Sequence, residues 1–202
     1  MATPGELVHV VAKALGIPEA TVVQYDRNLV AAGLRTKGGR GRSAAQVTSR
    51  DAANLLLAIG GAPIAGASVK ETRKTCARYG ALRAWGTRPS FSRVKSRYPT
   101  LAKLPDRHSF KEAIAALIDS IAAGEFGSPD PHADPNVSVH FDGPDPEGGI
   151  VVDYRAPRVQ LMYRQPVDIQ LSDTGLHQRR SFGFWTLSAV AKIVGITGMS
   201  DD

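Results

Sequence analysis

Cysteine is nearly absent from this 202-residue chain, which contains only Cys76. A single cysteine excludes an intramolecular disulfide and any metal site built from cysteine alone. Long apolar runs are lacking as well, since no stretch reaches the roughly 18 residues that a membrane span requires. The N-terminal segment MATPGELVHVVAKALG lacks the apolar core of a signal peptide and predicts a helix. These absences indicate a cytoplasmic protein without a membrane segment.

Motifs for enzymatic chemistry are missing too. The segment GGRGRSA lacks the Gly-Lys-Ser/Thr ending of a phosphate-binding loop. One group of acidic and histidine residues has the ligand types for a metal: Asp130, His132, Asp134, His140 and Asp142. We interpret this group as part of a linker instead, because loops favour Asp and Pro for their turn geometry. We therefore expect a protein that is not an enzyme, with no catalytic residue, metal site or cofactor.

Charge is divided unevenly along the chain. Residues 1–107 contain 18 Lys and Arg against 6 Asp and Glu, whereas residues 108–202 contain 7 against 13. The two halves thus carry net charges of +12 and −6, which together give the +6 of the whole chain. A basic half favours a polyanionic partner, and nucleic acid is the commonest one.

Apolar spacing predicts two short helices at the start of the chain. The first covers residues 5–15 and ends at Gly16, and the second extends from Pro18 to about Ala32. Residues 35–48 are expected to form a strand, a glycine-rich turn and a second strand. Thr48 or Ser49 then caps a helix through AANLLLAI, and Ser68 is a candidate N-cap for a basic helix over 69–85.

The order of these segments resembles the winged helix-turn-helix family, which includes MarR-like bacterial and phage transcription regulators. The resemblance rests on VAKALGIPEATVVQYDRNLVAAGL followed by RTKGGRGRSAAQVTSRDAANLLLAI, and it covers about residues 5–60. The chain departs from the family in having very few residues before the first helix. The usual leading helix is therefore missing or is supplied from later in the chain.

The resemblance implies that the helix of residues 18–32 lies in the major groove of double-stranded DNA. Its outward polar side chains would then contact bases or phosphates: Thr21, Gln24, Arg27 and Asn28. The wing would place four cations on phosphates or in the minor groove: Arg35, Lys37, Arg40 and Arg42. The alternative is a solvated basic loop that follows an ordinary polar helix face.

A second basic segment covers residues 70–107 and contains 11 Lys and Arg. We expect three cations at its start to add contacts to DNA: Lys70, Arg73 and Lys74. Three aromatic residues are interspersed with the cations, and we expect core positions for them over a stacking surface for single strands: Trp85, Phe91 and Tyr98.

The second half of the chain predicts helices and antiparallel strands. SFKEAIAALIDSIAAGEF (109–126) is an amphipathic helix with a capping box of Ser109 and Glu112. VSVHF (137–141) and GIVVDYRA (149–156) predict a hairpin around a Pro-rich loop too long for a tight turn. Residues 158–171 could add one or two strands, and 182–196 predict a last apolar helix. The fold class is therefore α+β, with a mainly helical N-terminal winged helix-turn-helix and a small C-terminal α+β domain containing an antiparallel hairpin or sheet.

Three regions follow from this pattern: a DNA-binding domain over 1–67, a basic connecting region over 68–107, and an acidic α+β domain over 108–202. The acidic domain is expected to form a homodimer or higher homo-oligomer, or to bind a protein partner. Its segment FGFWTLSAV has the aromatic-rich composition of interface cores, through Phe182, Phe184, Trp185 and Leu187. The alternative is that these side chains pack only within their own domain.

The function that these features favour is sequence-specific binding of double-stranded DNA. The chain would be a bacterial or phage transcription regulator, cytoplasmic and associated with the nucleoid. The alternative is a structural DNA-handling protein, such as a phage small terminase subunit or a replication or partition adaptor. An enzyme acting on nucleic acid is the least favoured, since no catalytic motif is recognised.

Overall fold

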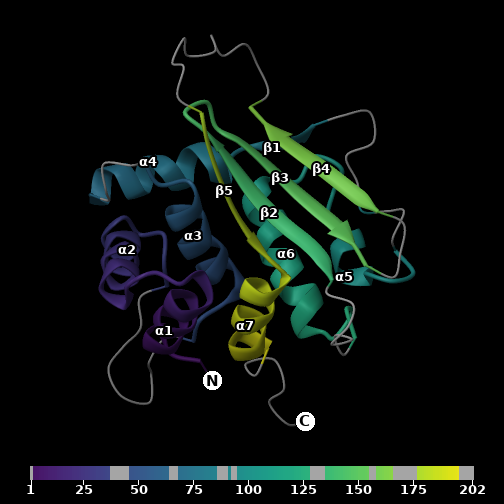
Figure 1. The fold of residues 1–202 in the computed structure, drawn as a ribbon, viewed down its shortest axis with the longest axis horizontal. Helices are drawn as coiled ribbons and strands as arrows, with labels where there is room; N and C mark the ends of the chain where they lie inside the picture. The colour runs from purple at the N-terminus through teal and green to yellow at the C-terminus, as the bar shows by residue number, and fades with distance from the viewer. Residues whose placement is uncertain are drawn as a thin grey trace.

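The computed structural model describes residues 2–36, 46–63, 68–85, 91, 95–127, 135–154, 158–165 and 177–195. Its helices are α1 (Pro4–Leu15), α2 (Glu19–Ala31), α3 (Ser49–Gly60), α4 (Val69–Gly80), α5 (Pro99–Ala102), α6 (Phe110–Ala122) and α7 (Phe184–Gly195). Its strands are β1 (Arg83–Trp85), β2 (Asn136–Gly143), β3 (Glu147–Asp153), β4 (Val159–Arg164) and β5 (Gln178–Gly183). Figure 1 shows helices α1 to α4 grouped beside the sheet.

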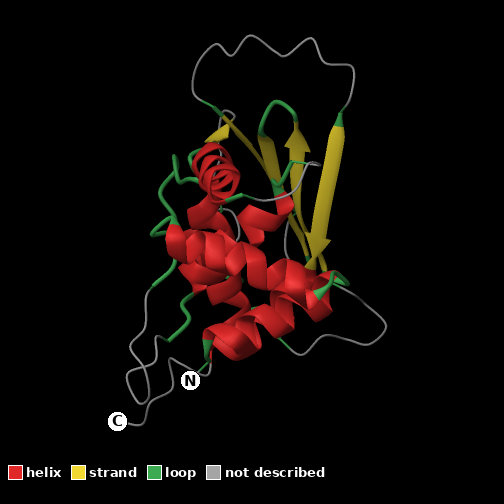
Figure 2. Ribbon diagram, turned by 90° about the vertical axis from the view of Figure 1, so that its left-hand side faces the viewer, coloured by secondary structure: helices red, strands yellow, loops and turns green. Residues whose placement is uncertain are grey.

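The α+β class is confirmed by a five-stranded antiparallel sheet in the order β1-β4-β3-β2-β5. Helices pack on one side of this sheet (Figure 2). Alternate residues of β2 explain why: Val137, Val139 and Phe141 are buried, while the residues between them are only partly so. The period of two in a strand directs these apolar side chains toward the helices.

Helix boundaries follow the local signals in the sequence. Gly16 ends α1 in the left-handed conformation, with φ of 65°, which glycine adopts without a Cβ clash. Thr48 caps α3, Ser68 caps α4, and Ser109 forms the expected capping box with Glu112 at the start of α6. These predicted helix starts are confirmed.

Helix α3 occupies the centre of the molecule and joins its two halves. Its residues 51–58 are all buried, and it packs against α2, α4, α6 and α7. Helix α7, from late in the chain, packs on α1, where the Thr186 hydroxyl donates to the Ala14 carbonyl at 3.4 Å. Apolar residues from the expected regions 1–67, 68–107 and 108–202 therefore form one continuous core.

Two element boundaries differ from the sequence-based expectation. The helix expected over 69–85 ends at Gly80, and residues 83–85 form strand β1. The sheet edge captures this segment, because Arg83 pairs with Arg164 and Trp85 with Met162. The last helix begins at Phe184, not at residue 182, because Phe182 pairs with Val139 in the sheet.

The β2–β3 connection is also shorter than expected. Strand β2 continues to Gly143 and β3 starts at Glu147, so only residues 144–146 connect them. The Gly143–Pro144 peptide bond is cis. The additional strand predicted within residues 158–171 is confirmed as β4 (Val159–Arg164).

Three of the four aromatic and apolar residues expected at an interface lie inside the molecule. Phe182, Phe184 and Leu187 are buried, whereas Trp185 keeps 56% of its surface exposed. The described residues thus place most of FGFWTLSAV in the protein's own core. None of the described helices is both long enough and apolar enough to cross a membrane.

Candidate nucleic-acid interface

The predicted recognition helix corresponds to α2. Its buried stripe consists of Val22, Tyr25 and Leu29, a helical spacing that fixes which side faces the core. Pro18 is the N-cap residue, so the helix begins at Glu19, one residue later than predicted. The opposite side of α2 exposes three of the four predicted contact residues: Thr21, Gln24 and Arg27.

Asn28, the fourth predicted contact residue, lies in the interior with 1% of its surface exposed. Its amide nitrogen donates to the Thr72 hydroxyl of α4 at 3.0 Å, and its carbonyl oxygen accepts from the Gln24 amide at 2.9 Å. A buried polar group requires such partners. Asn28 therefore connects α2 to α4 and orients Gln24, and it is not accessible to a base.

Arg35 was expected on the wing, but its guanidinium is held against α2. Its Nε lies 2.6 Å from Asp26 Oδ1, and the two side chains are only 12% and 13% exposed. Burial raises the pKa of Asp26, and the adjacent Arg35 charge opposes that rise. This partly buried ion pair attaches the segment after α2 to the helix.

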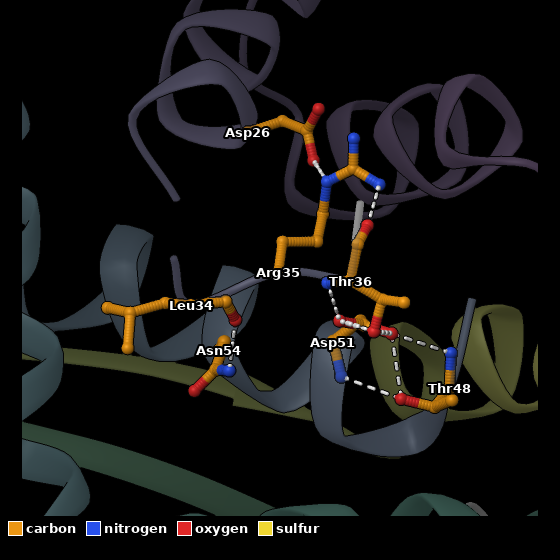
Figure 3. Close-up of polar contacts among 7 residues, drawn as sticks. All are labelled: Asp26, Leu34, Arg35, Thr36, Thr48, Asp51 and Asn54. Atoms are coloured by element: carbon orange, nitrogen blue, oxygen red, sulfur yellow. Dashed lines mark hydrogen bonds and ion pairs between the residues drawn. The ribbon is translucent and has the colours of Figure 1, made fainter. Parts of the chain in front are cut away.

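A cluster of hydrogen bonds around Asp51 joins Thr36 to Thr48, which precede and follow the basic segment 37–45 in the chain (Figure 3). One carboxylate oxygen accepts from the Thr36 backbone amide at 3.0 Å, and the other accepts from the Thr48 amide at 3.0 Å and the Thr48 hydroxyl at 2.8 Å. Asp51 is only 4% exposed. Asn54 extends the cluster, since its amide donates to the Leu34 carbonyl at 2.6 Å. We call Thr36, Thr48 and Asp51 the Asp51 cluster.

The Asp51 cluster explains why the ends of the predicted wing are not strands. Residues 35, 36 and 46–48 are irregular in the structure. The Thr36 and Thr48 amides donate to Asp51 and are thereby withdrawn from the strand ladder expected over 35–48. Three predicted contact residues lie in the segment outside the described residues: Lys37, Arg40 and Arg42.

The basic helix α4 lies beside α2, joined to it by the Asn28–Thr72 bond. Its buried stripe of Thr72, Cys76 and Tyr79 leaves the predicted cations exposed: Lys70, Arg73 and Lys74. Lys74 lines a pocket on the side of α4 that faces the β2–β3 connection. Lys70 and Arg73 are exposed on the helix that contacts α2 through Thr72 and do not line this pocket, so we group them with the exposed residues of α2. We call Thr21, Gln24, Arg27, Lys70 and Arg73 the α2–α4 surface.

The aromatic residues of the second basic segment have mixed positions. Phe91 and Tyr98 are buried core residues as expected, but Trp85 lies on the edge strand β1 with 57% of its surface exposed. Among the described residues, no group of three or more histidine, cysteine or acidic side chains could hold a metal ion. His140 Nε2 and Asp142 Oδ2 lie 3.8 Å apart, whereas Asp130, His132 and Asp134 fall outside the description.

Three residues that build this interface were not recognised from the sequence: Asp26, Asp51 and Thr72. The spacing Thr48-x-x-Asp51 is a capping-box pattern and could have revealed the first half of the Asp51 cluster. The bond from Thr36 to Asp51 connects residues 15 positions apart, and the bond from Asn28 to Thr72 connects residues 44 positions apart. No local pattern signals such contacts.

Comparison of the chain with protein families, with curated protein sequences and with solved structures finds no match. The interface is therefore argued from the residues of this chain alone.

Proposed function

We propose that the protein binds double-stranded DNA through the α2–α4 surface and the cations of the basic segment 37–45. The observation that carries this proposal is the Asp51 cluster. It joins Thr36 to Thr48, which precede and follow a segment rich in glycine and cations. In this proposal the cations of that segment contact phosphates of the duplex.

Charge supports the same interface. Arg27, Lys70 and Arg73 are exposed on adjacent helices, and Lys37, Arg40 and Arg42 belong to the segment between Thr36 and Thr48. Phosphate contacts from such cations supply most of the affinity of a DNA-binding protein. Glycines 38, 39 and 41 would let the segment approach the phosphate backbone closely.

Sequence preference would come from Gln24 and Arg27. Glutamine makes a bidentate pair with adenine and arginine with guanine in the major groove. The bond from Gln24 to the buried Asn28 fixes the amide of Gln24 before DNA arrives, which lowers the entropy lost on binding. The protein would act on DNA as a winged helix-turn-helix regulator in this proposal, and a homodimer would present two such surfaces to a two-fold symmetric site.

The first experiment selects bound duplexes from a random pool and measures their affinities by fluorescence anisotropy. Gln24→Ala and Arg27→Ala are each expected to reduce discrimination between selected and random duplexes by about 1–3 kcal/mol, the value of one bidentate pair. If both variants discriminate as well as the parent protein, α2 does not contact bases.

The second experiment measures affinity for random duplex as a function of salt concentration. Arg73→Ala is expected to weaken binding to all sequences alike and to reduce the log–log salt slope by about 0.9. The matched control is Arg158→Ala, which removes one exposed cation beside strand β4 and should leave the slope unchanged. Equal slopes for the two variants would contradict a contact between α4 and DNA.

A further inference from the structure

A pocket of about 340 Å³ lies between the C-terminal end of α3, helix α4, the β2–β3 connection and strand β5. Its volume is at the lower end of the range for small-molecule sites, about 300–1,000 Å³. The pocket thus has room for one compact ligand. It lies on the side of α4 that carries Lys74 and Arg78, apart from Arg73 of the α2–α4 surface.

The pocket is strongly cationic. Among the described residues that line it, three are basic, Lys74, Arg78 and Arg180, and one is acidic, Glu71. Lys74 and Arg78 are four residues apart on α4, so they project from the same side of the helix. Arg180 enters from β5, on a different wall. Cations from two separate elements that converge on one cavity favour an anionic ligand.

The two arginines are already oriented by backbone carbonyl groups. Arg180 Nη1 donates to the Ile59 carbonyl at 3.2 Å and to the Ala62 carbonyl at 2.6 Å. Arg78 Nη2 donates to the Pro144 carbonyl at 3.3 Å. Each guanidinium carries five N–H donors. Arg78 uses Nη2 and Arg180 uses Nη1 for these bonds, so both keep donors for a ligand. Side chains fixed in this way lose less entropy when a ligand binds.

An aromatic wall accompanies the cations. The rings of Tyr79 and Phe141 lie edge to face with centroids 5.6 Å apart, and the Tyr79 hydroxyl donates to the Asp142 carbonyl at 2.7 Å. The chain at the C-terminal end of α3 packs directly on both rings: a Cβ at Gly60 would lie 2.6 Å from Phe141, and one at Gly61 would lie 2.5 Å from Tyr79. Both residues line the pocket but are largely buried, with 7% of Tyr79 and 2% of Phe141 exposed.

We propose that this pocket binds a small organic anion that combines a phosphate group with a planar ring, as a nucleoside monophosphate does. Lys74, Arg78 and Arg180 would bind the phosphate, since arginine forks match its oxygens. The planar ring would contact Tyr79 or Phe141. This site is separate from the proposed DNA interface and does not depend on it.

The test is isothermal titration calorimetry of the full chain with each of the four common ribonucleoside monophosphates. At least one is expected to bind, and the corresponding nucleoside and inorganic phosphate are each expected to bind at least about tenfold more weakly, because each lacks one half of the recognised chemistry. Failure of all four to bind at millimolar concentration would overturn the proposal. Inorganic phosphate binding as tightly as the best nucleotide would overturn the role of the ring.

Variants of pocket residues test whether the nucleotide binds in this pocket. Arg78→Ala and Lys74→Ala remove exposed side chains and should each lower nucleotide affinity by about tenfold, the loss of a charge-assisted contact. Lys103→Ala removes an exposed lysine outside the pocket and outside the α2–α4 surface; it is the matched control and should bind as the parent does. Nucleotide binding that both pocket variants retain would overturn the assignment.

A last measurement tests whether the ligand is a free nucleotide or the phosphorylated end of a nucleic-acid strand. A 5′-phosphorylated single-stranded oligonucleotide is expected to bind more weakly than the free nucleotide, because the pocket holds only one compact ligand. Tighter binding of the oligonucleotide that is lost in Arg78→Ala would overturn the small-ligand proposal in favour of a strand-end site. Failure of these tests would leave the Arg73→Ala salt slope, and hence the DNA proposal, unaffected.

Discussion

Replacing Asp51 with alanine tests the contact on which the proposed interface depends. The carboxylate accepts hydrogen bonds from both the Thr36 and the Thr48 backbone amides, and it is 96% buried by the surrounding chain, with 4% exposure. The substitution removes every one of these bonds and leaves two amides without their acceptor. It leaves the rest of α3 intact, because Asp51 occupies only the first turn of that helix.

The expected loss of stability combines two contributions. Loss of the capping box at the start of α3 costs about 1 kcal/mol. Loss of the charged acceptor for Thr36 costs about 2 kcal/mol more, within the range for hydrogen bonds to charged groups. The free energy of unfolding should therefore fall by about 3 kcal/mol, which for a chain of this size lowers Tm by roughly 6–12 °C.

Urea denaturation followed by far-UV circular dichroism measures this loss. Asp51→Asn should lose about half as much, roughly 1–2 kcal/mol, because its amide retains one acceptor oxygen. Asp106→Ala is the control: Asp106 is exposed, and surface changes are usually within about 0.5 kcal/mol. If Asp51→Ala costs no more than Asp106→Ala, the carboxylate does not join Thr36 to Thr48. In a folded Asp51→Ala protein, duplex affinity should also fall, since Thr36 and Thr48 are no longer joined.

Three other expectations concern the core. Gly61→Ala should cost about 1–3 kcal/mol in urea denaturation, because its Cβ would lie 2.5 Å from the Tyr79 ring; a neutral result would mean that the ring moves aside freely. Burial lowers the pKa of His108 below its ordinary value of 6.5 in the folded protein. The unfolded chain therefore takes up a proton on this histidine at a higher pH than the folded protein does. The free energy of unfolding should fall as the pH drops below about 6.5 and through the folded pKa. His108→Gln should flatten that dependence between pH 7.5 and 5, and an unchanged slope would assign it to other groups. Burial also raises the pKa of Cys76 to about 12, so Ellman's reagent should modify it only on unfolding, and rapid labelling of the native protein would contradict its burial.

Local signals in the sequence were sufficient for much of the fold. Ser68, Thr48 and the Ser109–Glu112 pair each marked a helix start correctly, because a cap is made by residues three positions apart. The segment VSVHF was likewise correctly predicted as a strand, and it forms part of β2. Contacts of this kind are decided within a few residues, so the chain needs no tertiary information to reveal them.

Contacts between distant segments could not be predicted. Residues 83–85 have a helical continuation by local pattern, but pairing with β4 makes them a strand. Asn28 has a side chain that can pair with adenine, yet it lies in the interior, where it donates to Thr72, a residue 44 positions away in the chain. In the same way, Arg180 donates to the carbonyls of Ile59 in α3 and of Ala62 just after it, across 121 and 118 residues, and so completes the cationic pocket. Each outcome depends on which surfaces meet, and a single sequence does not specify this.

The packing of α7 on α1 has a consequence for biosynthesis. The two helices are joined by a bond spanning 172 positions, from Thr186 to Ala14, so the contact forms only after the ribosome has made the residues between them. Domains usually fold as they emerge; α1 can pack on α2 at once, but its side that contacts α7 stays uncovered until residue 186 has emerged. We therefore expect slow folding dominated by long-range closure.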